Sequence, residues 1–224
     1  MKMYALTEAY ISHRLAEAQK SPTDESYLSA FLSDAPRPAA VLIPLFHASA
    51  EEKKKHIWQV LLTRRTVSVA EHQGQVAFPG GRADPTDTSP EVTALREAHE
   101  EIGLDPSRVR VLGRMNSLWT ITNYLVTPVI GVIPWPFPLH LEEIEVSRVF
   151  TIPLDWLADP DHHEIRYRTI PRPFSQILHH ERHPVIYFNP YQDELLWGVS
   201  AEIILSFINI LDNKKTGGHS IARQ

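Results

Sequence analysis

Three glutamates in the middle of the chain have the residue type and the spacing expected of a site for a divalent cation. Glu97, Glu100 and Glu101 stand at positions i, i+3 and i+4, and in a helix this spacing brings the three carboxylates within one turn. Uncompensated like charges at this spacing weaken a helix, so a neutralising group is expected. Mg²⁺ and Mn²⁺ bind a few carboxylate oxygens and take their other ligands from water and phosphates. We therefore predict a Mg²⁺ or Mn²⁺ site at these three residues.

The residues around the glutamates extend the candidate site. Arg96 lies beside Glu97 and four positions before Glu100, where it could orient both carboxylates. Upstream, the pair Gly80 and Gly81 can let the backbone approach a phosphate group closely. The alternative interpretations are a solvated acidic helix face with an Arg–Glu pair, and a tight turn at the two glycines.

Taken together, residues 80–104 resemble the Nudix box, the loop and helix signature of hydrolases that act on nucleoside diphosphates linked to another group. The match is complete over the helix, at Arg96, Glu97, Ala98, Glu100, Glu101, Gly103 and Leu104. In the loop, Thr88 stands where the general pattern has a glutamate and Arg82 where it has a glycine, so the loop is one residue longer counted from Gly81. This longer spacing resembles the coenzyme A pyrophosphatase branch of the family.

A second segment resembles the same branch. The branch has a frame that runs from leucine-leucine-threonine-x-arginine to phenylalanine-proline-glycine-glycine. This frame is reproduced by Leu61–Thr66, Gly74 and Phe78–Gly81. Thr66 replaces the usual serine or alanine, and Ala70 replaces a second arginine. Later segments at 143–150 and 197–201 are also similar, so the resemblance covers roughly residues 38–210.

The resemblance implies a function and a set of roles. The expected reaction is cleavage of the pyrophosphate bond of coenzyme A or a derivative, giving a phosphopantetheine product and adenosine 3′,5′-bisphosphate. The cation would polarise the diphosphate, water would attack, and Glu100 or Glu145 would act as the base. Arg65 is expected to contact a substrate phosphate, as its planar guanidinium allows, beside Gly80 and Gly81.

Two alternatives use the same residues. Because Ala70 replaces an arginine of the branch, the substrate could be another nucleoside diphosphate derivative, such as ADP-ribose or a dinucleotide. The chain could also be a non-catalytic Nudix module that senses a ligand or binds a protein, although intact Glu97, Glu100 and Glu101 favour catalysis.

The elements that position these residues follow from periodicity and from turn residues. Helical spacing occurs in two pieces within residues 4–34, in the acidic helix between a cap at Ser89 and a stop at Gly103, and at 203–211. Strands are predicted at 39–46, 58–63, 108–111, 115–121, 125–133, 164–169 and 184–188.

This order predicts an α/β (α+β) fold in which a Nudix-type mixed β-sheet is sandwiched between helices. We divide the chain into a helical N-terminal extension at 1–35, a Nudix hydrolase domain at 36–212, and a flexible C-terminal tail at 213–224.

Composition narrows the ligand and the compartment. The net charge of −5 argues against a broad cationic surface for nucleic acid. The resemblance to Nudix hydrolases implies a small nucleotide as the partner. The chain has no cysteine, which excludes thiolate metal sites. The first residues do not form a secretory signal, and prolines interrupt the uncharged stretch 115–141, so we expect a cytoplasmic protein that does not cross a membrane. A homodimer is possible, without a specific pattern to support it.

Overall fold

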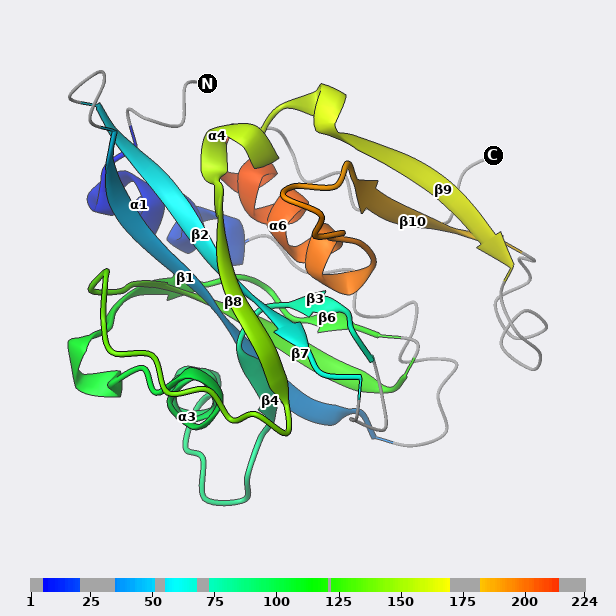
Figure 1. Cartoon of the computed structure of the whole chain (residues 1–224). Coiled ribbons are helices and arrows are strands. Elements are labelled where there is room, and N and C mark those ends of the chain that lie inside the picture. The colour runs from blue at the N-terminus through cyan, green and yellow to red at the C-terminus, as the bar shows by residue number, and fades with distance from the viewer. Residues whose placement is uncertain are drawn as a thin grey trace.

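The computed structural model describes residues 6–20, 35–50, 55–67, 73–120, 122–169 and 182–213. Figure 1 shows a twisted sheet with the helix α3 on one face and the helices α1 and α6 on the other. This arrangement confirms the prediction of a mixed sheet sandwiched between helices.

The sheet is built around two long neighbouring strands, β1 (Arg37–Ala50) and β2 (Lys55–Arg65), which pair antiparallel. On its other side β1 pairs in parallel with β7 (Tyr124–Val132), which makes the sheet mixed. The remaining strands of this sheet are β3 (Val76–Ala77), β4 (Gly80–Arg82), β5 (Arg110–Arg114), β6 (Leu118–Trp119) and β8 (Val146–Pro153).

Alternation along β1 divides the apolar residues into two cores. Leu42 and Phe46 point to the side of α3, whereas Ile43 and Leu45 point to the side of α1 and α6. Successive side chains of a strand face opposite sides of a sheet, so a strand that is buried on both faces carries a continuous apolar run.

The acidic helix α3 (Pro90–Ile102) begins and ends where the sequence predicts. The Ser89 side chain accepts a hydrogen bond from the amide of Val92, and Gly103 ends the helix in the left-handed conformation at φ 73°. Ala94 and Ala98 are fully buried against the sheet, while Val92 is 42% exposed. The face of α3 that carries Ala94 and Ala98 therefore packs on the sheet, and Val92 lies outside it.

The opposite face of the sheet is covered by α1 (Glu8–Gln19) and α6 (Val199–Leu211). Ile11 and Leu15 of α1 are buried in the same core as α6, and the Tyr10 hydroxyl donates to the carbonyl of Leu211 at 3.0 Å. The first helical piece of the N-terminal extension thus packs on the domain, and the second piece lies outside the described residues. The domain boundaries themselves stay a prediction.

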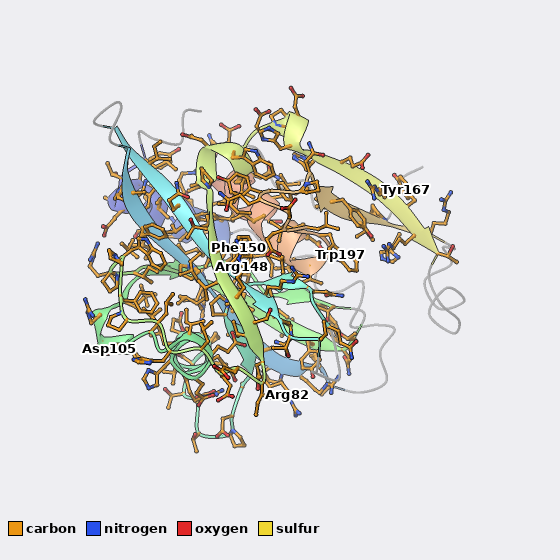
Figure 2. All side chains as sticks on the ribbon, viewed as in Figure 1. Arg82, Asp105, Arg148, Phe150, Tyr167 and Trp197 are labelled. Atoms are coloured by element: carbon orange, nitrogen blue, oxygen red, sulfur yellow. The ribbon has the colours of Figure 1, made fainter. Side chains whose placement is uncertain are left out.

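A separate two-stranded hairpin, β9 (His163–Thr169) and β10 (Arg182–Phe188), projects from this body. It is joined to β8 through the short helix α4 (Leu154–Leu157). Tyr187 of β10 stacks on Trp197 with ring centroids 5.4 Å apart. Figure 2 shows Trp197 where the hairpin meets the body, and Tyr167 farther out along the hairpin.

Two strand predictions need correction. The strand predicted at 115–121 is only Leu118–Trp119 in the structure, and β8 was not predicted as a strand. Within the described residues, no helix is both long enough and apolar enough to cross a membrane.

Replacing Ala98 by leucine should separate α3 from the sheet. Ala98 has no exposed surface, and extra methyl groups in a packed core typically cost about 1–3 kcal/mol. We expect Ala98→Leu to lower the free energy of unfolding by this amount in urea denaturation, with a fall in any activity that depends on α3. Val92→Leu, on the exposed side of the same helix, is the matched control and should change stability little; an equal loss in both variants would contradict the packing described for α3.

Candidate active site

A cavity of about 280 Å³ lies between α3 and the loop that precedes β8. Its lining is almost entirely acidic, and consists of Glu97, Glu100 and Glu101 from α3 and Glu142, Ile144 and Glu145 from the loop. Four of these residues, Glu97, Glu100, Glu101 and Glu145, belong to the site predicted from the sequence. The fold therefore brings carboxylates that are more than forty residues apart in the chain to one place.

Glu101 is the most buried of these carboxylates. It is 4% exposed, and its Oε2 atom is buried without a hydrogen-bond partner. Burial raises the pKa of Glu101 to about 8, against the opposing effects of the nearby Arg65 guanidinium and of a hydrogen bond from the Gly80 backbone. Burial thus favours the protonated acid, because a buried anionic oxygen without a partner is costly, and a cation beside Oε2 would favour the ionised carboxylate.

Arg96, in the middle of α3, links the helix to the loop before it. Its guanidinium donates to Asp87 at 3.0 Å, to the carbonyl of Arg82 at 2.9 Å, and to Glu100 at 2.9 Å. It also forms an ion pair with Glu97 at 2.9 Å. In Figure 2, Arg82 and Asp105 mark the two sides of α3 in this view.

The two glycines lie in β4, where both pair with β1. A Cβ atom at Gly81 would lie 2.5 Å from Oε2 of Glu97, so the absence of a side chain makes room for this carboxylate. A Cβ atom at Gly80 would lie 2.4 Å from the carbonyl oxygen of Ala40. The geometry thus explains both glycines by close packing, and their contact with a substrate phosphate stays a prediction.

Arg65 lies at the end of β2, directly beside the cavity. Its Nη1 atom is 3.9 Å from Oε1 of Glu101, and its Nε atom is buried without a hydrogen-bond partner. The side chain is 26% exposed, so other donors of the guanidinium face solvent, as expected for a residue that contacts a phosphate.

The carboxylates do not yet form a coordination sphere. Among the described residues, no three aspartate, glutamate or histidine side chains are grouped closely enough to hold one metal ion. Arg96 pairs with both Glu97 and Glu100, and these ion pairs keep the two carboxylates turned towards the arginine. The Glu100 side chain is 56% exposed, so it can rotate away from the arginine.

Sequence reasoning missed two residues of the site. Glu142 is not among the site residues predicted from the sequence, yet it lines the cavity. Asp87 is not among the predicted site residues either, yet its side chain is 3% exposed and forms an ion pair with Arg96. The signal that indicates Asp87 is the extra residue in the loop. Asp87 stands nine positions before Arg96, whereas the general pattern has a glutamate eight positions before the arginine.

Replacing Asp87 by asparagine should loosen the loop from α3. Hydrogen bonds from Arg96 hold the pKa of Asp87 at about 2, below its ordinary value, so the carboxylate stabilises the fold above about pH 4. This contribution is lost as the pH falls towards 2. We expect Asp87→Asn to cost about 1.5–3 kcal/mol at pH 7, measured by urea denaturation, with the difference from the wild type shrinking below pH 4.

The exposed residue Asp161 provides the control for this change, because its side chain is far less buried. Asp161→Asn should leave the unfolding curve almost unchanged across the same pH range. A difference between Asp87→Asn and the wild type that stayed constant from pH 7 to pH 2 would contradict the assigned ion pair.

Comparison with known proteins identifies the family. The NUDIX domain matches residues 36–173. A Photorhabdus laumondii protein named "Uncharacterized Nudix hydrolase NudL" is 42% identical over 174 residues, which cover 77% of this chain and 84% of the relative. The protein of the same name from Yersinia pestis (strain Pestoides F) is 37% identical over 204 residues, covering 89% of this chain and 94% of that one.

The fold is also found in solved structures. A MutT/nudix family protein from Enterococcus faecalis superposes with a TM-score of 0.50 at 15% identity, over 90% of this chain and 74% of the other. The domain match and the two relatives show that the chain belongs to the Nudix hydrolase family.

Proposed function

We propose that this Nudix hydrolase cleaves the pyrophosphate bond of coenzyme A or a derivative, in a reaction that depends on Mg²⁺ or Mn²⁺. The products would be a phosphopantetheine compound and adenosine 3′,5′-bisphosphate. The observation that carries the proposal is the acidic cavity, in which the buried Oε2 atom of Glu101 has no hydrogen-bond partner. The substrate rests on the frame at residues 61–81, which resembles the coenzyme A pyrophosphatase branch.

The residues of the cavity fit a hard divalent cation. Its lining supplies only carboxylate oxygens and no sulfur or imidazole, which is the donor set that Mg²⁺ and Mn²⁺ prefer. Glu97, Glu100 and Glu101 would hold the cation, once Glu97 and Glu100 turn from Arg96. Bound there, it would offset the charge that develops on the diphosphate and favour ionisation of the attacking water.

The other residues of the site have roles that follow from their positions. Arg65, with its buried and unpartnered Nε atom, would orient a substrate phosphate beside Glu101. Glu145 and Glu100 both line the cavity and are the candidate bases for the water. Arg96 would direct the carboxylates of α3, since it contacts Glu97 and Glu100 and is itself fixed by Asp87.

Ala70 favours a second class of substrate as the alternative. The branch that the frame resembles usually has an arginine at this position, and its loss removes a potential contact to an anionic group. Another nucleoside diphosphate derivative, such as ADP-ribose or a dinucleotide, is therefore the alternative substrate. The relatives are named hydrolases, which favours catalysis over a non-catalytic module.

Replacing Glu101 by glutamine should abolish most activity while keeping the shape of the side chain. The amide removes one negative charge from the cation site, and metal assistance contributes several kcal/mol to such reactions, so we expect kcat to fall on the order of 100-fold or more. Mn²⁺ binding, measured by isothermal titration calorimetry, should weaken in parallel. Glu143→Gln is the matched control, since Glu143 is exposed on the loop and does not line the cavity; the cation assignment is wrong if both variants keep full activity.

A substrate panel tests the choice of substrate. Purified protein would be incubated with coenzyme A, acetyl-coenzyme A, ADP-ribose and a diadenosine dinucleotide, each with Mg²⁺, with Mn²⁺ and with chelator, and the products separated by chromatography. We expect metal-dependent release of adenosine 3′,5′-bisphosphate from the coenzyme A compounds. Faster turnover of ADP-ribose or the dinucleotide would assign the protein to the alternative class.

A further inference from the structure

The loop that carries Glu145 is attached to the molecule on two sides. On the side of α3, the amide of Glu142 donates to the carbonyl of Glu101 at 3.0 Å, and the amide of His140 donates to the carbonyl of Ile102 at 3.2 Å. These bonds join the loop directly to the end of the helix that carries the proposed cation ligands.

On the side of β2, two hydroxyl groups hold the loop. The Thr66 hydroxyl donates to the carbonyl of Ile144 at 2.6 Å, and the Thr66 amide donates to the carbonyl of Glu145 at 2.9 Å. The Ser147 hydroxyl donates to the carbonyl of Arg64 at 3.0 Å, and a weaker contact of 3.4 Å reaches the carbonyl of Arg65. The chain is therefore held to the end of β2 on both sides of Glu145, at Ile144 and at Ser147.

Packing alone does not explain the position of this loop. Glu142, Glu143 and Ile144 are exposed, Ile144 to 71%, and only Val146 is buried. Glu145 also shares the cavity with Glu97 and Glu101, and these carboxylates repel one another when they are ionised. The hydrogen bonds to α3 and to β2 therefore hold the loop against this repulsion, because its exposed residues make few apolar contacts.

We infer that Thr66 and Ser147 are positioning residues, whose hydroxyl groups hold the Glu145 loop against the repulsion of the α3 carboxylates and so set the distance between Glu145 and the reacting diphosphate. The same strand end carries Arg65 beside Glu101, so the end of β2 lies next to one proposed cation ligand and also holds the loop of the candidate base. This inference rests on the proposed function only for the role of Glu145.

The test compares Thr66→Val, which removes the hydroxyl at nearly constant shape, with Thr66→Ser, which keeps it. Small displacements of a reacting group have large effects on rate, so we expect Thr66→Val to lower kcat on the order of 10-fold with little change in KM, and Thr66→Ser to restore most of it. Ser107→Ala removes a hydroxyl that donates to Asp105 in the turn after α3 and is the control for loss of a surface hydroxyl. Thermal unfolding of all three variants separates a rate effect from loss of stability, and a fall in kcat that merely followed the melting temperature would overturn the inference.

A double-mutant cycle shows whether Thr66 acts through Glu145. Once Glu145→Gln has removed the group that the loop positions, Thr66→Val should have almost no further effect on kcat. An equal loss in the wild-type and the Glu145→Gln backgrounds would overturn the inference.

Hydrogen exchange separates this inference from the proposed function. The amides of Ile144, Glu145 and Val146 all bond to Glu142, and their exchange should accelerate in Thr66→Val but not in Thr66→Ser, whether or not coenzyme A is the substrate. Unchanged exchange in Thr66→Val would refute the hydroxyl attachment even if the substrate panel succeeded. Failure of the panel with accelerated exchange would refute the substrate alone.

Discussion

Repulsion among carboxylates that share one cavity is the constraint on which the rest of the site depends. Five glutamates line the space between α3 and the loop before β8, and the most buried of them, Glu101, is 4% exposed. Two arginines, Arg65 beside Glu101 and Arg96 beside Glu97, offset part of this charge. A protein maintains such a cluster only where the fold supplies the stabilisation, and a bound cation would relieve the repulsion that remains.

The scaffold explains how the cluster is maintained. Two fully buried alanines let α3 lie close against β1, which brings Glu101 down to the end of β2. Gly81 leaves space for the Glu97 carboxylate, and Asp87, in the loop before α3, fixes Arg96. Each of these contacts is made by a residue outside the set of proposed ligands, so the geometry of the site depends on its surroundings as much as on its glutamates.

Local features of the sequence were sufficient to predict the helix and its charges. The cap at Ser89, the stop at Gly103 and the i, i+3, i+4 spacing of the glutamates depend on neighbouring residues alone, and the structure confirms the helix that they define. The apolar runs of β1 and β7 likewise indicated buried strands. By contrast, the burial of Glu101 and the cavity wall from Glu142 to Glu145 follow from contacts between distant segments. The strand β8 was not predicted because its apolar and polar residues do not alternate clearly: Ser147 and Arg148 are adjacent, and so are Val149 and Phe150.

The measurement that tests the central claim most directly is a crystal structure of the protein soaked with Mn²⁺, with the anomalous difference map calculated near the manganese absorption edge. We predict a peak in the cavity, within about 2.0–2.4 Å of carboxylate oxygens, with Glu101 bonded to the ion and with Glu97 or Glu100 turned from Arg96. A peak bound elsewhere, or a cavity without any peak at saturating Mn²⁺, would contradict the account of this cluster as a divalent-cation site.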